Sequence, residues 1–167
     1  MKKIAIVLFF GLLFAKGCEE NKWLNVDNDV FFEPQEIRTE TSKEFEVIIK
    51  AESKYKIYGF AFDLDYDPLV LQYASIKDGD FFPSECHCLS LSDSKQQPGK
   101  VIFGYSLMGD KCLGQAGSGT VTTFKFKAIG QPQINWLSLS NCYLCIIEGK
   151  DHAFVKAQWP PASIIIE

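Results

Sequence analysis

The sequence predicts an all-β fold, a nine-stranded β-sandwich with jelly-roll topology. Short apolar segments with a period of two recur along the chain, and turns rich in glycine and proline separate them. No segment combines helical periodicity with capping residues at both ends. The 167 residues are 47 % hydrophobic and 14 % aromatic, which suits the core of one domain. We find no internal repeat and no second domain.

The segment 58–71, YGFAFDLDYDPLVL, is the most informative strand candidate. Residues two apart on a strand share a face, so its two faces differ in chemistry. Burying each large apolar side chain contributes roughly 1.5–3 kcal/mol, which directs the aromatic face to the core. Pro68 ends the strand because proline lacks a backbone donor. The inner face would hold Phe60, Phe62, Leu64 and Tyr66, and the outer face Ala61, Asp63, Asp65 and Asp67.

The outer face of this strand places carboxylates about 6.8 Å apart. At an effective dielectric near 20, two such charges repel by about 2 kcal/mol. Cross-strand lysines, a bound cation or a basic partner would offset this repulsion.

Eight further strands are expected on either side of this segment. Among them, the strand over 101–107 places Val101, Phe103 and Tyr105 on one face. Turns are expected over 36–43 and 54–56, a long loop over 81–99, and a glycine-rich loop over 109–119. These eight strands are predicted at 30–32, 45–49, 71–76, 101–107, 120–128, 134–139, 143–147 and 164–166.

The first 17 residues are typical of a secretory signal peptide. Two lysines precede an apolar run over 4–15, and small residues lead to Cys18. Cleavage before Cys18 predicts an extracytoplasmic protein, either lipid-anchored at the cell envelope through Cys18 or released in soluble form. A tether over 18–25 and a single domain over 26–167 would follow.

Five further cysteines fit an oxidising compartment, where they normally form disulfides. We expect Cys112 to pair with Cys86 or Cys88, although spacing does not determine connectivity. The alternative is a metal site made of four thiolates, or of three with His87. The full set of candidate disulfide cysteines is Cys86, Cys88, Cys112, Cys142 and Cys145.

Charge and motifs argue against several functions. The net charge of −4 and the dispersed lysines disfavour nucleic-acid binding. The two histidines, His87 and His152, lie in no nucleophile motif, and the segment 114–119 (GQAGSG) lacks the lysine and helix of a phosphate loop. We therefore expect no enzymatic activity and no cofactor.

Several motifs together resemble the cohesin domain. They are the segment 58–71, the turn at Gly79, GSGTVTTFKFKAIG over 117–130 and the short apolar strand at the end. The stretch EPQEIRTETSKEFEVIIKAE over 33–52 fits the opening strands. The resemblance covers the chain from Val26 onward. It implies a jelly-roll sandwich that binds dockerins, which are calcium-loaded helical modules, through a flat sheet face.

The resemblance also implies site residues. Asp65 and Asp67 match positions where cohesins use Asn and Asp to bind the partner, and the charge on Asp65 favours a more basic one. In that fold the strand over 117–130 lies beside the acidic strand, so Lys125 and Lys127 would face Asp63 and Asp65. The candidate partner-binding residues are Asp63, Asp65, Asp67, Tyr105, Lys125 and Lys127.

The alternative function is carbohydrate binding, with a polysaccharide recognised through exposed aromatic side chains. Such a module needs a coplanar row of rings on its surface. The candidates are Trp23, Tyr55, Tyr58, Trp136 and Trp159.

Overall fold

The computed structural model describes residues 18–20, 29–94, 97–109, 112–148 and 151–167. The described residues form eleven strands, and none of them belongs to a helix that could cross a membrane. The all-β prediction is therefore confirmed, with two more strands than expected. The strands are β1 (Cys18–Glu20), β2 (Val30–Phe32), β3 (Glu36–Thr39), β4 (Glu44–Asp65), β5 (Leu71–Asp78), β6 (Cys88–Asp93), β7 (Lys100–Leu107), β8 (Gln115–Ala128), β9 (Gln133–Glu148), β10 (Asp151–Lys156) and β11 (Ala162–Ile166).

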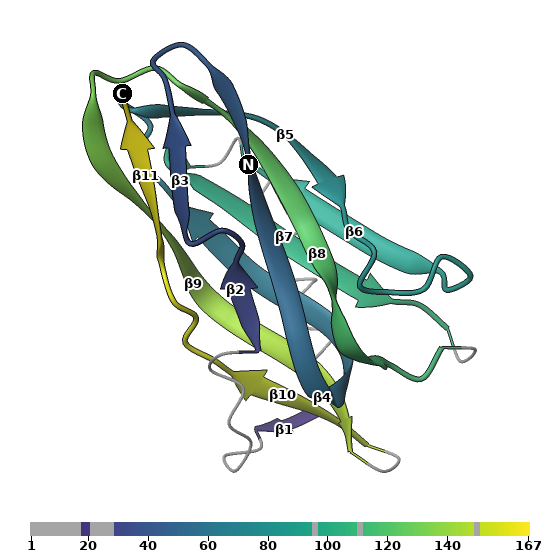
Figure 1. Cartoon of the computed structure of the whole chain (residues 1–167). Helices are drawn as coiled ribbons and strands as arrows, with labels where there is room; N and C mark the ends of the chain where they lie inside the picture. The colour runs from purple at the N-terminus through teal and green to yellow at the C-terminus, as the bar shows by residue number, and fades with distance from the viewer. Residues whose placement is uncertain (1–17, 21–28, 95–96, 110–111, 149–150) are drawn as a thin grey trace, which may run out of the picture.

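The strands pack as two layers, which Figure 1 shows one behind the other. The front layer holds β5, β8, β2 and the first half of β4, and β3 and β11 lie at its side. The rear layer runs in the order β6, β7, second half of β4, β9 and β10. Because β4 and β9 each pair with strands of both layers, all eleven strands share one hydrogen-bonded network. This closure forms a jelly-roll sandwich.

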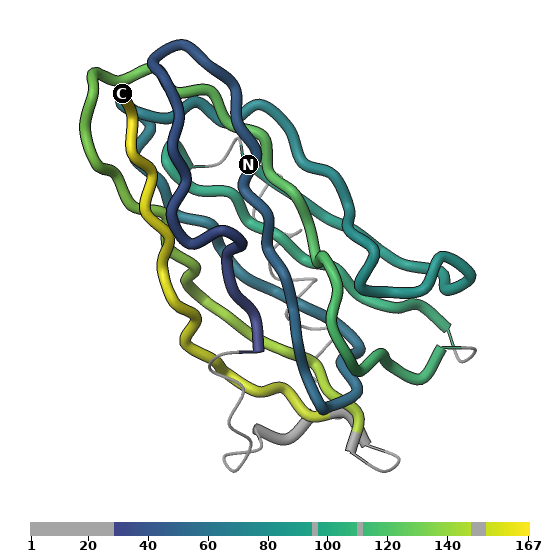
Figure 2. The backbone as a smooth tube through the Cα atoms, in the orientation of Figure 1, coloured from purple at the N-terminus to yellow at the C-terminus, as the bar shows by residue number. Residues whose placement is uncertain are grey.

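Strand β4 contributes to both layers because it bends in the middle. Its first half pairs with β8, and the register with β8 slips between Ser53 and Ile57. From Gly59 onward β4 lies between β7 and β9 instead. The backbone trace in Figure 2 reverses direction at this bend and continues in the rear layer. The turn predicted at 54–56 is thus a bend within one long strand.

The core lies between the layers, and the aromatic face of β4 points into it as predicted. Phe60, Phe62 and Leu64 are 3 %, 1 % and 0 % exposed. The Phe62 ring lies 4.9 Å from that of Phe103 in the rear layer and 6.3 Å from that of Phe124 in the front layer. Such offset ring pairs stabilise the packing beyond their buried area, by about 1 kcal/mol each.

Three expectations about loops and strand breaks need correction. The stretch 36–43 contains β3, which pairs in parallel with β11 at the end of the chain. The stretch 81–99, predicted as a loop, contains β6. The first two residues of this stretch, Phe81 and Phe82, are buried. The two strands predicted over 134–147 are one strand, β9, with Asn141 at a φ of 50° where the pairing with β4 shifts.

The cysteine prediction holds in part. Cys86 forms a disulfide with Cys112, which ties the start of β6 to the segment before β8. Cys88, Cys142 and Cys145 were expected in disulfides, but all three are thiols. Cys142 and Cys145 are both buried, but residues three apart on a strand point to opposite faces, so these two cannot pair with each other. The disulfide uses two of the thiolates that the alternative metal site requires, and the described side chains include no cluster suited to holding a metal ion.

The N-terminal predictions fall mostly outside the described residues. Residues 1–17, the proposed signal peptide, lie outside them, as do 21–25 of the expected tether. Residues 18–20 form β1, which pairs in parallel with β10 instead of forming a tether. Lipidation of Cys18 stays a prediction.

Candidate functional site

The outer face of the rear layer brings the acidic residues of β4 between two strands. Asp63 lies opposite Ile102 of β7 and Ser140 of β9. Two residues further along, Asp65 lies opposite Lys100 and Ser138. Since side chains alternate along a strand, all of these residues point away from the core.

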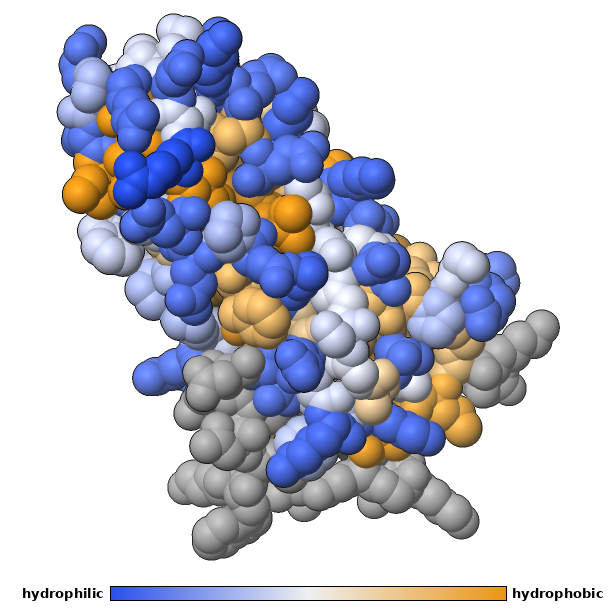
Figure 3. Space-filling model, viewed as in Figure 1, coloured by the Kyte–Doolittle hydropathy of each residue, from blue (hydrophilic) through white to orange (hydrophobic). Residues whose placement is uncertain are grey.

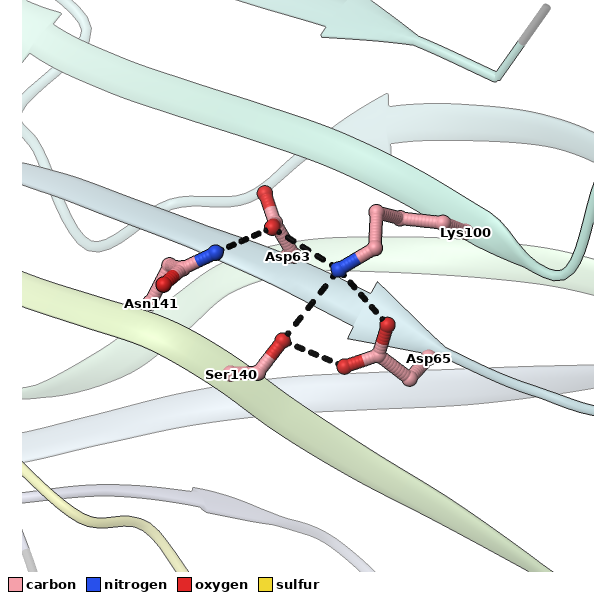
Figure 4. Close-up of polar contacts among 5 residues, drawn as sticks. All are labelled: Asp63, Asp65, Lys100, Ser140 and Asn141. Atoms are coloured by element: carbon pink, nitrogen blue, oxygen red, sulfur yellow. Dashed lines mark hydrogen bonds and ion pairs between the residues drawn. The ribbon is translucent and has the colours of Figure 1, made fainter. Parts of the chain in front are cut away.

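A single lysine holds both carboxylates (Figure 4). Lys100 Nζ lies 2.9 Å from Asp63 Oδ2 and 2.8 Å from Asp65 Oδ1. Asn141 Nδ2 donates to the same Asp63 oxygen at 2.7 Å, and the Ser140 hydroxyl donates to Asp65 Oδ2. The Lys100 cluster, consisting of these five residues, therefore links β7, β4 and β9.

The Lys100 cluster is partly buried, which strengthens its interactions. The side chains of Asp63, Lys100 and Asp65 are 13 %, 22 % and 32 % exposed. The hydrogen bond to Asp65, with a further one to Asp63, raises the pKa of Lys100 although burial opposes the shift. Lys100 thus offsets the repulsion expected between neighbouring carboxylates.

Lys125 and Lys127 do not face Asp63 and Asp65, so that prediction is wrong. They lie on β8, which pairs with the first half of β4 in the front layer. There Lys125 Nζ lies 2.6 Å from Glu44 Oε2 on the exposed surface. The prediction failed because β4 changes layer before it reaches its aspartates.

Two more predicted site residues have structural roles, one in core packing and one in a turn. Tyr105 points into the core, is 5 % exposed, and its ring lies 5.0 Å from that of Phe82. Burial, followed by a hydrogen bond to Cys88, raises the pKa of Tyr105. Asp67 forms the corner after β4, where Oδ1 accepts a hydrogen bond from the Leu69 amide at 2.9 Å. Neither residue belongs to the open face.

Sequence reasoning missed an apolar area beside the Lys100 cluster. Leu89, Leu91 and Ile102 are 37 %, 43 % and 40 % exposed. Leu91 lies opposite Gly104, where an added Cβ would meet no atom within 4 Å. The alternation of leucine with serine over 88–93 was the available signal, but the stretch was interpreted as a loop. We call this apolar area together with the Lys100 cluster the docking face.

The aromatic residues proposed for carbohydrate binding do not form an exposed row. Trp159 is buried at 6 % exposure, while Tyr55 and Tyr58 are half-buried. Trp136 alone among the described candidates is largely exposed, at 61 %. Trp23 lies outside the described residues.

The chain is thus an all-β sandwich whose rear layer exposes both apolar and charged side chains on its outer face. The family model for the cohesin domain matches residues 35–135 of this chain. The chain therefore belongs to the cohesin family, whose members are non-catalytic protein–protein interaction modules. No curated protein matches the chain.

Solved cohesin structures share the fold at low sequence identity. The seventh ScaB type I cohesin from Pseudobacteroides cellulosolvens is 20 % identical, with a TM-score of 0.66 over 83 % of this chain and 90 % of that one. A non-cellulosomal cohesin from Archaeoglobus fulgidus is 19 % identical, with a TM-score of 0.61 over 83 % and 91 %. The Coh-OlpC-Doc435 cohesin–dockerin complex from Clostridium thermocellum gives 12 % identity and a TM-score of 0.69 over 89 % and 99 %.

Proposed function

We propose that this cohesin domain binds a dockerin-like helical module of another exported protein through the docking face. Several structures of the same fold are cohesin–dockerin complexes, including those from Clostridium thermocellum. The resemblance of the segment 58–71 to cohesins implies that the partner binds the sheet containing this strand. The docking face is the outer surface of that sheet.

The observation that carries the proposal is the contact between an apolar area and a pre-formed polar cluster on one flat sheet. Interfaces commonly have an apolar centre with polar groups around it. Ile102 lies directly opposite Asp63 across the β4–β7 pair, so the apolar area and the Lys100 cluster are in contact. Because Lys100 already orders both carboxylates, binding would require little further loss of side-chain freedom.

The charge of the Lys100 cluster favours a partner rich in hydrogen-bond donors. Two carboxylates against one ammonium group leave a net negative charge. Lys100 and Asn141 both bind Oδ2 of Asp63, which leaves Oδ1 as the acceptor that we propose for the partner. A lysine, an arginine or a serine hydroxyl on a partner helix would satisfy it.

The proposed setting is extracytoplasmic. The signal peptide predicted over 1–17 supports export, and the Cys86–Cys112 disulfide fits an oxidising compartment. Lipidation at Cys18 would hold the domain at the membrane surface, whereas cleavage without lipidation would release it.

A bulky residue at position 104 tests the proposal most cleanly. The space in front of Gly104 is open, so Gly104→Arg should fold normally and obstruct the face. The probe is a purified dockerin module encoded in the same genome, and its affinity is measured by isothermal titration calorimetry. We expect Gly104→Arg to weaken binding at least roughly tenfold, which corresponds to 1.4 kcal/mol.

The matched control is Thr123→Arg, which places the same side chain on β8 in the opposite layer. Its affinity should equal that of the wild type. Equal binding by Gly104→Arg and the wild type, with both variants folded, would exclude the docking face.

A further inference from the structure

A second exposed surface lies on β9, β11 and β3, at the side of the sandwich. The β9–β11–β3 pairing aligns Trp136, Ser163 and Glu36 in one row and Ile134, Ile165 and Arg38 in the next. Trp136 and Ile134 are 61 % and 62 % exposed, although both are large apolar residues. In Figure 3 apolar surface gathers over β3 and β11 beside strongly hydrophilic side chains. We call these six residues the Trp136 platform.

Hydrogen bonds fix the polar side of the platform. Arg38 donates from Nε and Nη2 to Glu36 Oε1 at 3.1 and 2.9 Å, and from Nη1 to Glu167 Oε1 at 3.1 Å. These bonds, with the charge of Glu36, raise the pKa of Arg38, so the guanidinium stays ionised between two carboxylates. The planar groups are thereby held beside the apolar row.

The row that contains Trp136 also carries polar side chains. Asn135 does not belong to this row, because it pairs with the buried Ile164 and faces the other side of β9. The Ser163 hydroxyl lies directly across the β9–β11 pair. An exposed aromatic face is therefore bordered by a hydroxyl and, one strand further, a carboxylate.

We propose that the Trp136 platform binds a neutral pyranose ring of a polysaccharide. A pyranose in its chair form presents C–H groups on its faces and hydroxyls around its edge. The C–H face would stack on the indole, whose ring face is electron-rich, and the hydroxyls would bond to Ser163 and Glu36. A neutral ligand fits better than an acidic one because two carboxylates, Glu36 and Glu167, outnumber the single guanidinium of Arg38.

This site adjoins the docking face without depending on it. Trp136 lies two residues from Ser138, which pairs with Asp65, so about 6.8 Å of strand separates the two positions. The residues of the platform come from β9, β11 and β3, whereas β6 and β7 form the apolar part of the docking face. Sugar binding at Trp136 and partner binding at Gly104 can therefore be lost separately.

The test uses cellohexaose, xylohexaose, mannohexaose and chitohexaose with the full mature protein. Proton–nitrogen NMR spectra should show three indole cross-peaks, one for each tryptophan. The Trp136 peak is assigned by its absence from Trp136→Phe. We expect at least one hexaose to shift this peak in a saturable manner, while the Trp159 indole in the core does not respond.

Variants then localise the binding. Trp136→Ala should weaken hexaose affinity at least roughly tenfold, and Trp136→Phe should restore most of it. Leu113→Ala is the control, because Leu113 is equally exposed, at 64 %, but lies before β8. The proposal fails if no hexaose shifts the Trp136 peak, or if Trp136→Ala binds as the wild type does. It also fails if Trp136→Ala reduces only dockerin affinity, which would place Trp136 in the protein interface.

Discussion

Lys100 and Lys125 both pair with acidic residues of β4, yet their surroundings differ. Lys100 is 22 % exposed, contacts two carboxylates and joins three strands through Ser140 and Asn141. Lys125 is 43 % exposed and forms an ion pair with the exposed Glu44. An exposed pair is screened by water and contributes little to stability, whereas a partly buried network loses several hydrogen bonds when one member is removed. Position within the sandwich therefore decides what each lysine does.

The largest expected effect comes from removing Lys100. Lys100→Met should lower the free energy of unfolding by about 2 kcal/mol, because two partly buried carboxylates lose their shared donor. Urea denaturation measures the change. Lys125→Met, the matched control, should leave the unfolding midpoint unchanged. Equal losses in the two variants would contradict the distinction between them.

A smaller effect is expected at Ser140. Ser140→Ala removes the hydroxyl that donates to Asp65 and should cost about 1 kcal/mol of unfolding free energy. Ser138 also lies opposite Asp65 but is exposed, so Ser138→Ala provides the comparison in the same denaturation series. If both serine variants lost the same unfolding free energy, the hydrogen bond from Ser140 would contribute nothing to stability.

The exposed ion pair between Lys125 and Glu44 should be detectable through the pKa of Glu44. The hydrogen bond from Lys125 lowers the pKa of Glu44 below the ordinary 4.5. Its contribution is therefore present above pH 4.5 and is lost as pH falls through the lowered value. An NMR titration should show the Glu44 pKa return toward 4.5 in Lys125→Met. High salt should have the same effect in the wild type, since exposed pairs are screened. A Glu44 pKa unaffected by both changes would disprove the pair in solution.

The smallest effect concerns two thiols with opposite surroundings. Burial, followed by the charges of Asp63 and Asp65, raises the pKa of Cys142 to about 12, whereas Cys88 is exposed. Iodoacetamide should modify Cys88 in the native protein and Cys142 only after unfolding, as read by peptide mass spectrometry. Because the unfolded Cys142 thiol ionises near 9.0, its contribution to stability should decline as pH rises from 9.0 toward 12. Rapid native labelling of Cys142 would refute its burial.

Much of the fold could be predicted because period-two alternation directly reports which face is buried. The two faces of 58–65 were predicted correctly on this basis. Strand β3 was missed because its partner, β11, lies at the far end of the chain, so nothing local marks the hydrogen bonds. Strand β6 was missed although its partner β7 follows it directly, because the leucine–serine alternation of β6 lies in a stretch rich in turn-forming residues.

The site was harder to predict because its contacts depend on where strands change layer. Asp63 and Asp65 were placed correctly on an outer face, but Lys125 was chosen as their neighbour instead of Lys100. The bend between Ser53 and Ile57 separates the β8 side of β4 from its aspartates. Only the register of β7 brings Lys100 opposite Asp65. Local sequence does not encode that pairing.

The most direct test compares the two layers in one experiment. Isoleucine methyl spectra are recorded while a dockerin module from the same genome is added. Ile102 lies on the docking face, and Ile48 lies on the outer side of β4 in the front layer, opposite Thr123. We predict that the Ile102 methyl shifts on binding and that the Ile48 methyl stays in place. A shift of Ile48 with Ile102 unchanged would place the partner on the opposite layer and contradict the proposed docking face.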